Sequence, residues 1–145
     1  MKRFTTSVAL GAILLALAVP FASAEAGTKG PKPDKIAHGA KVDIKAHLVA
    51  GKTTIIDFTS DFCPPCRYFS PLLDELHAKR DDLAVVKVDI NRPDVRGIDW
   101  ESPVVAQYGL ESVPHFKIFG ADGKLVAEGD AARDMIVGWL GLETK

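Results

Sequence analysis

Residues 55–67 run Ile-Ile-Asp-Phe-Thr-Ser-Asp-Phe-Cys-Pro-Pro-Cys-Arg and contain both cysteines of the 145-residue chain. Their first half belongs to a β-branched, almost wholly apolar run over 53–59, which predicts a buried strand. Their second half opens a helical pattern over 65–80, in which the apolar residues share one face. Cys63 and Cys66 therefore stand where a buried strand passes into the start of a helix.

A Cys-x-x-Cys pair at a helix start is suited to redox chemistry. The free N–H groups and the positive end of the helix dipole face the first sulfur and favour its thiolate. We therefore expect Cys63 to be the exposed nucleophile and Cys66 the buried resolving thiol, which releases the reduced partner from a mixed disulfide. The reverse sequence donates a disulfide. An inert structural disulfide is the alternative, although so short a loop stabilises a fold weakly.

Metal binding is another interpretation of this spacing. Structural zinc usually takes four ligands, often with a second Cys or His pair. No two of the four histidines of the chain are separated by three to five residues, as zinc-binding pairs are, so we predict no metal and no cofactor. A soft copper site built from Cys63, Cys66 and His115 stays open as an alternative.

Length and composition restrict the class of protein further. A chain of 145 residues suits one domain. With 47% hydrophobic and 8% aromatic residues, it is not a disordered protein. The 18 basic and 19 acidic residues give no basic excess for nucleic acid, and two cysteines are too few for a disulfide scaffold. We predict a single folded domain that binds no nucleic acid.

The N-terminus predicts a secretory signal peptide over residues 1–24. Lys2 and Arg3 precede an uncharged run over 8–21, and Ala-Ser-Ala at 22–24 fits a cleavage site. The run is shorter than the roughly 20 apolar residues that span a bilayer, which leaves an uncleaved anchor as the alternative. We expect export to the periplasm or another extracytoplasmic space, where disulfides persist.

The rest of the chain alternates strands and helices. Residues 25–35, rich in Gly, Pro and Lys, predict a flexible leader before a domain over 36–145. Strands are predicted over 53–59, 83–90, 115–119 and 125–128, and helices over 44–50, 65–80, 104–108 and 130–140. This order predicts an α/β domain whose central mixed β-sheet is flanked by helices on both faces.

The run over 55–67 resembles the active-site segment of the thioredoxin family. The other matching positions are Pro71 after the second cysteine, Val113-Pro114 as the cis-proline element, and the glycines Gly123 and Gly129. The resemblance covers residues 40–142, nearly the whole domain. It implies a thioredoxin fold and a thiol–disulfide oxidoreductase that needs no cofactor.

The resemblance also implies roles for single residues. Asp57 is an acid in an apolar strand, where burial raises a carboxyl pKa, and we expect it to accept the proton of Cys66 through water. Lys87 on the next strand resembles the family lysine that pairs with this acid. The residues expected to contact an extended substrate are Phe62, Pro64, Val113 and a cis Pro114.

Several positions depart from the family pattern. Phe62 replaces the usual tryptophan and Pro64 the usual glycine. Because proline has no N–H, one hydrogen bond to the sulfur of Cys63 is expected to be lost. His115 stands where threonine is common, and a protonated imidazole near the sulfurs would favour the thiolate. The segment 91–103 is longer than in compact thioredoxins and resembles the reductase-type domains of membrane electron-transfer proteins.

The sequence and this resemblance together predict an exported, monomeric thiol–disulfide oxidoreductase that acts on disulfide- or dithiol-containing proteins. We favour a reductase recharged by a membrane electron donor, because the small domain has no substrate-binding insertion. A disulfide oxidase or isomerase, a copper metallochaperone and a redox-silent binding module are the alternatives. Trp100, in the long segment, is a candidate contact for a partner.

Overall fold

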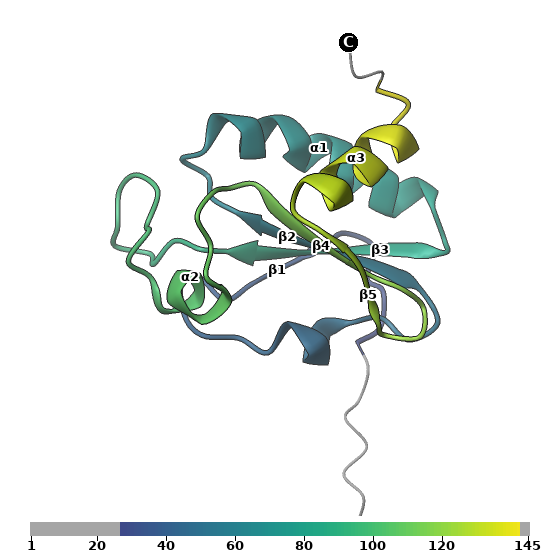
Figure 1. Cartoon of the computed structure of the whole chain (residues 1–145), viewed down its shortest axis with the longest axis horizontal. Helices are drawn as coiled ribbons and strands as arrows, with labels where there is room; N and C mark the ends of the chain where they lie inside the picture. Colours follow the sequence, from purple (N-terminus) through teal and green to yellow (C-terminus); the bar gives the residue numbers. More distant parts are fainter. Residues whose placement is uncertain (1–26, 143–145) are drawn as a thin grey trace, which may run out of the picture.

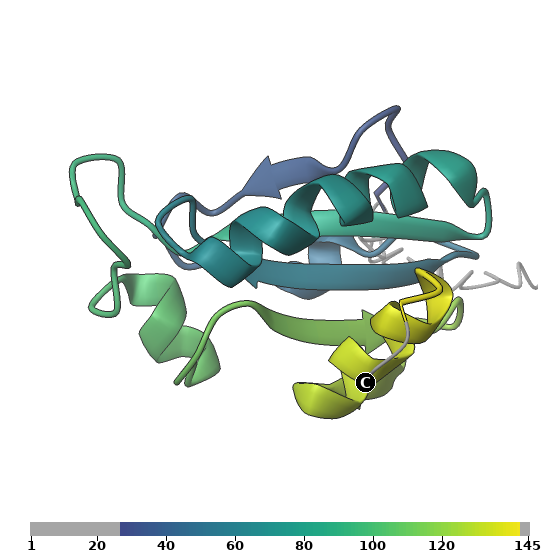
Figure 2. The ribbon, with the colours of Figure 1, turned by 90° about the horizontal axis from the view of Figure 1, so that it is seen from above.

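A five-stranded sheet lies between two layers of helices (Figure 1, Figure 2). The computed structural model describes residues 27–142, and the predicted signal peptide lies outside them. The elements in chain order are β1 (Asp34–Ile36), the 3-10 helix η1 (Ile44–His47), β2 (Thr53–Thr59), α1 (Pro64–Lys79), β3 (Leu83–Asp89), α2 (Pro103–Tyr108), β4 (His115–Phe119), β5 (Leu125–Glu128) and α3 (Asp130–Trp139). No helix of the described part is long and apolar enough to cross a membrane.

The sheet has the mixed topology that the sequence predicts. Its strand order is β1-β3-β2-β4-β5. The first three of these strands are mutually parallel, and β4 and β5 are antiparallel to their neighbours. Because helices cover both faces, the central strand β2 is buried from Thr54 onward, and β3 is buried along its whole length.

Alternation along β2 divides the core into two clusters. Ile55 packs with residues of α1 and α3 on one face, whereas Ile56 and Phe58 pack with residues of η1 and α2 on the other. Successive side chains of a strand point to opposite faces. Asp57 therefore points to the same face as Ile55, beneath α1.

Helix α1 begins at the redox pair because prolines fit its first turn. Pro64 and Pro65 occupy positions whose N–H groups would have no acceptor within the helix. Cys63 caps the helix, since its Sγ accepts the N–H of Cys66 at 3.2 Å. Pro71 lies inside the helix, where it removes one backbone hydrogen bond.

The N-terminal segment differs from the prediction. The flexible leader predicted over 25–35 is wrong from Gly27 onward, because β1 pairs in parallel with β3 and Gly27 donates to the carbonyl of Leu48 at 3.1 Å. The imidazole of His77 accepts the N–H of Val85 at Nδ1, so its Nε2 donates to the carbonyl of Gly30 at 2.9 Å. These contacts extend the folded domain to the N-terminal side of residue 36.

The helix predicted over 44–50 is also shorter than expected. Only η1 forms, and Leu48 is already extended. The N–H of Val49 then donates to the hydroxyl of Thr54 at 3.1 Å instead of continuing a helix. Side-chain competition of this kind ends helices early, because a hydroxyl offers the backbone another acceptor.

Candidate active site

Cys63 and Cys66 form a disulfide at the N-terminus of α1, with their Cα atoms 5.2 Å apart. Each residue is only 1% exposed. The prediction that Cys63 is exposed is therefore wrong for this disulfide state, whereas the burial of Cys66 is confirmed. The physical reason is that the loop before β4 approaches the first sulfur, and the carbonyl oxygen of Val113 lies 3.5 Å from its Sγ.

The helix supplies one N–H group to the sulfur of Cys63. Pro64 and Pro65 have no N–H, so the first donor that the helix can offer is Cys66, at 3.2 Å. In the reduced protein, this donor and the positive end of the helix dipole favour the thiolate of Cys63. The two prolines thus leave the N–H of Cys66 as the helix donor to the sulfur of Cys63.

The peptide bond between Val113 and Pro114 is cis, as the family resemblance implies. It places the backbone of Val113 beside the sulfur of Cys63. Phe62 and Pro64, the chain neighbours of this cysteine, are both exposed. Backbone and side-chain contacts for an extended polypeptide are thus available on either side of the reactive bond.

Asp57 is a buried carboxyl without a hydrogen-bond partner. It is 1% exposed, and neither carboxylate oxygen is hydrogen-bonded within residues 27–142. Burial raises the pKa of Asp57 from 3.8 to about 7; the charge of Lys87 limits this rise, and the charge of Asp74 adds to it. A carboxyl with this pKa can take up or release a proton at neutral pH.

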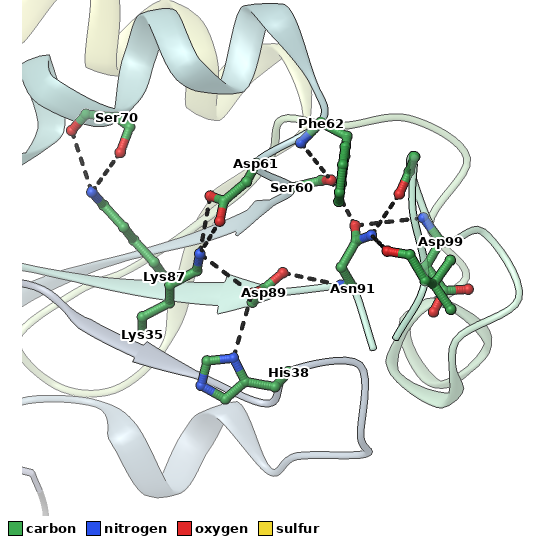
Figure 3. A network of polar contacts seen from close by, with 12 residues as sticks. Lys35, His38, Ser60, Asp61, Phe62, Ser70, Lys87, Asp89, Asn91 and Asp99 are labelled. Atoms are coloured by element: carbon green, nitrogen blue, oxygen red, sulfur yellow. Dashed lines mark hydrogen bonds and ion pairs between the residues drawn. The ribbon is translucent and has the colours of Figure 1, made fainter. Parts of the chain in front are cut away.

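Lys87 lies opposite Asp57 in the register of β2 and β3, but its ammonium group binds elsewhere. It donates to the hydroxyl of Ser70 at 2.7 Å (Figure 3). It also forms an ion pair with Asp74 on α1. Lys87 and Asp57 therefore do not form the expected direct ion pair, although the charge of Lys87 still lowers the pKa of Asp57. The long lysine stem reaches the half-exposed carboxylate of Asp74, where the charges stay closer to water.

A hollow of about 410 Å³ opens beside Cys66. Its lining includes Ser70, Asp74 and Lys87 as well as this cysteine. Water in the hollow can therefore reach both the resolving sulfur and the ion pair of Lys87. Asp57 is not among the lining residues, so the hollow provides water at Cys66 and does not itself reach the carboxyl.

The side chain of His115 binds an acidic group of the neighbouring strand. Its Nε2 lies 3.1 Å from Oε1 of Glu128, which also accepts the ammonium of Lys117. In the region that the structure describes, with Cys63 and Cys66 joined as a disulfide, no three His, Cys, Asp or Glu side chains are arranged to hold a metal ion. Glu128 could not be foreseen as the partner because the register of β4 and β5 places it there.

A polar network beside the active-site turn was not predicted from the sequence (Figure 3). Lys35 bridges Asp61 at 2.8 Å and Asp89 at 3.3 Å, and the Nδ1 of His38 lies 3.4 Å from Asp89. Asn91 continues the network toward the long segment 91–103. The separation of these residues in the sequence hides the network, because only the sheet brings the ends of β1, β2 and β3 together.

Comparisons with known proteins agree with the fold and the cysteine site described above. The thioredoxin family model matches residues 37–140. A thioredoxin H-type of Brassica campestris is 31% identical over 93 residues, covering 64% of this chain and 69% of that protein. The thioredoxin of Mycoplasmoides gallisepticum is 28% identical over 85 residues, covering 59% of this chain and 76% of that protein.

Solved structures share the fold. A mutant thioredoxin from Halobacterium salinarum aligns with a TM-score of 0.52 and 24% identity, covering 81% of this chain and all of that chain. Thioredoxin f2 in complex with ferredoxin:thioredoxin reductase aligns with a TM-score of 0.51 and 22% identity, covering 77% of this chain and 94% of that chain. At these identities the likeness concerns the fold.

A helix-capping Cys-x-x-Cys pair beside a cis-proline, on a mixed sheet covered by helices, defines a class of proteins that exchange disulfides. The chain belongs to the thioredoxin family. It is a thiol–disulfide oxidoreductase with a redox-active pair at Cys63 and Cys66. The predicted family and fold are confirmed.

Proposed function

We propose that this protein is an exported reductase of protein disulfides. The Cys63 thiolate attacks one sulfur of a substrate disulfide, forms a mixed disulfide and releases the second substrate sulfur as a thiolate. Cys66 loses its proton to Asp57 through water and attacks Sγ of Cys63, which releases the reduced substrate. Two electrons pass to the substrate, and the Cys63–Cys66 disulfide remains.

One observation carries this proposal: Cys63 caps α1, so that the N–H of Cys66 points at its sulfur. The same backbone geometry that holds the disulfide stabilises a thiolate after reduction. The buried carboxyl of Asp57 supports the resolving step, because its raised pKa suits it to accept a thiol proton at neutral pH. The first feature favours attack of Cys63 on a substrate disulfide, and the second favours release of the reduced product by Cys66.

Re-reduction of the pair requires an electron donor. Thioredoxin f2 has been solved in complex with ferredoxin:thioredoxin reductase. We propose a comparable relationship here, with a membrane-bound dithiol protein as the donor. Export is supported by the charged start, apolar run and Ala-Ser-Ala pattern over residues 1–24.

The test is reduction of insulin disulfides with dithiothreitol as the electron source. The unchanged protein is expected to accelerate precipitation of the insulin chains, and Cys63→Ser to abolish the acceleration. Cys66→Ser is expected to accumulate a mixed disulfide with the substrate, visible by non-reducing electrophoresis, because the resolving thiol is absent.

Glu75→Ser is the matched control, since it places a serine at an exposed position of the same helix. It is expected to keep full turnover. Equal turnover by Cys63→Ser and the unchanged protein would exclude the proposed function. Faster transfer of a disulfide from the oxidised protein to a reduced substrate than reduction in the opposite direction would favour a disulfide oxidase instead.

A further inference from the structure

We propose that Asn91 is a positioning residue for the active-site turn, residues 60–63, and that it joins this turn to the loop over 91–101 as one mechanical unit (Figure 3). The loop extends beyond the end of the sheet in both views of the molecule (Figure 1, Figure 2). The inference deepens the proposed function, because it rests on Cys63 as the nucleophile.

Ser60 connects Asn91 to the turn. It is 1% exposed, and its hydroxyl donates to Oδ1 of Asn91 at 2.6 Å. The same hydroxyl oxygen accepts the N–H of Phe62 at 3.2 Å. The carbonyl of Ser60 accepts the N–H of Cys63 at 3.1 Å. One buried residue therefore accepts both backbone N–H groups that lead directly into the reactive sulfur, that of Phe62 at its hydroxyl and that of Cys63 at its carbonyl.

Asn91 also holds the loop. It is 7% exposed, and its side-chain amide donates to the carbonyl of Gly97 and lies 3.5 Å from that of Val95. Its Oδ1 lies 3.5 Å from the N–H of Asp99, and its own N–H donates to Asp89 at 3.0 Å. The donors and acceptors of this one amide thus bind both the turn and an irregular loop.

An ion pair within the loop over 91–101 joins its two ends, so that holding Asn91 also holds the rest of the loop. The guanidinium of Arg92 binds the carboxylate of Asp99 at 2.7 and 2.9 Å, and Asp99 is itself buried. A bidentate pair of this kind is rigid compared with a single hydrogen bond. A displaced loop would therefore move Asn91 as well.

Loss of the Asn91 amide leaves the buried hydroxyl of Ser60 without its acceptor. A buried polar group that loses its partner reorients or is destabilised. We expect the turn to loosen and the sulfur of Cys63 to sit less well against the N–H of Cys66. The thiolate then loses part of its stabilisation, although neither Asn91 nor Ser60 contacts the sulfur.

The experiment measures alkylation of Cys63 by iodoacetamide in reduced protein that carries Cys66→Ser, so that one thiol reacts. Asn91→Ala and Ser60→Ala are each expected to react about three to ten times more slowly near neutral pH, which is the range for weakening one hydrogen bond to a charged sulfur. The rates should converge in alkaline solution, where Cys63 is a thiolate in every variant. The double variant should be no slower than the slower single variant, because both act through the same hydrogen bond.

His77→Ala is the matched control. His77 is also buried and also ties a separate chain segment to the sheet through two backbone hydrogen bonds, but it lies near the far end of α1. It is expected to lower the free energy of unfolding and leave the pH profile of alkylation unchanged. A profile of Asn91→Ala equal to that of its parent, a similar shift in His77→Ala, or additive effects of Asn91 and Ser60 would each overturn the inference. An unreactive Cys63 in the parent would overturn the proposed function itself.

Discussion

At the scale of single residues, the buried carboxyl of Asp57 makes the stability of the protein depend on pH. Burial raises its pKa from 3.8 to about 7, so the folded protein holds this proton more tightly than the unfolded chain does. The contribution of Asp57 is most favourable below about pH 4 and falls as the pH rises to about 7, where the total loss is about 4 kcal/mol.

Asp57→Asn is therefore expected to remove most of this decline between about pH 4 and about pH 7. The free energy of unfolding in guanidinium chloride, measured at several pH values, checks this result. Asp134→Asn, which changes an exposed carboxyl, is the control and should keep the decline. Parallel pH profiles for the unchanged protein and Asp57→Asn would contradict the account.

Lys87 and Asp74 should shift the titration of Asp57 in opposite directions. The ammonium of Lys87 lowers the pKa of Asp57 and the carboxylate of Asp74 raises it, although Lys87 and Asp74 bind each other. Lys87→Met is expected to move the titration to higher pH and Asp74→Asn to lower pH. Carbon NMR of the Asp57 carboxyl measures the titration midpoint in each variant. Shifts of this midpoint in the same direction would contradict the opposite effects expected of the two charges.

Residues whose role depends on their own segment could be predicted from the sequence. Cys63 and Cys66 at a strand-to-helix passage and Asp57 within an apolar strand are local patterns. The partners of Lys87 and His115 could not be predicted, because a helix turn and a strand register bring in the acidic groups that bind them.

At the scale of elements, the chain between β1 and η1 packs tightly against the residue that follows Asn91. Gly39 has a positive φ of 81°, and a Cβ on it would lie 2.6 Å from Cγ and 2.7 Å from the backbone nitrogen of Arg92. Gly51 has a similar φ of 72° but open space around it. A side chain at Gly51 would therefore cause backbone strain alone, whereas one at Gly39 would cause both strain and steric overlap.

Gly39→Ala is expected to destabilise the fold by about 3 kcal/mol or more, because left-handed strain and overlap with backbone add. Gly51→Ala should cost about 1 kcal/mol, from the strain alone. Urea unfolding of both variants gives the comparison. Equal losses would show that the contact between Gly39 and Arg92 is not restrictive.

The strand β1 shows why elements are harder to predict at the edges of a sheet. It has three residues, of which Asp34 and Lys35 are exposed, so it carries no apolar alternation. Its position depends on pairing with β3 and on the contact of His77 with Gly30, both distant in the sequence. The strands β2 and β3 are longer and buried on both faces, and their apolar runs predict them directly.

At the scale of the whole molecule, apolar patterning was sufficient to predict the mixed sheet and the helices on both faces. The family was predicted from the resemblance of residues 55–67, Pro71 and Val113-Pro114 to thioredoxins. The network that joins Lys35, Asp61, Asp89 and Asn91 was not predictable. It exists only because three parallel strands end together beside the active-site turn.

The proposed export belongs to the same scale, since it would set the compartment in which the redox pair works. When the full chain is expressed in a bacterial host, we expect the protein in the periplasmic extract to begin at Glu25, after cleavage of the Ala-Ser-Ala segment. Mass spectrometry of the intact protein measures this terminus. Recovery of the uncleaved chain in the membrane fraction would instead support an anchor.

The equilibrium reduction potential of the Cys63–Cys66 pair tests the central claim most directly. The pair is equilibrated with dithiothreitol buffers of known potential, and the fraction of disulfide is measured. A reductase predicts a value near that of thioredoxins, about −270 mV. A value near that of strongly oxidising disulfide donors, about −120 mV, would contradict the proposed direction of electron flow.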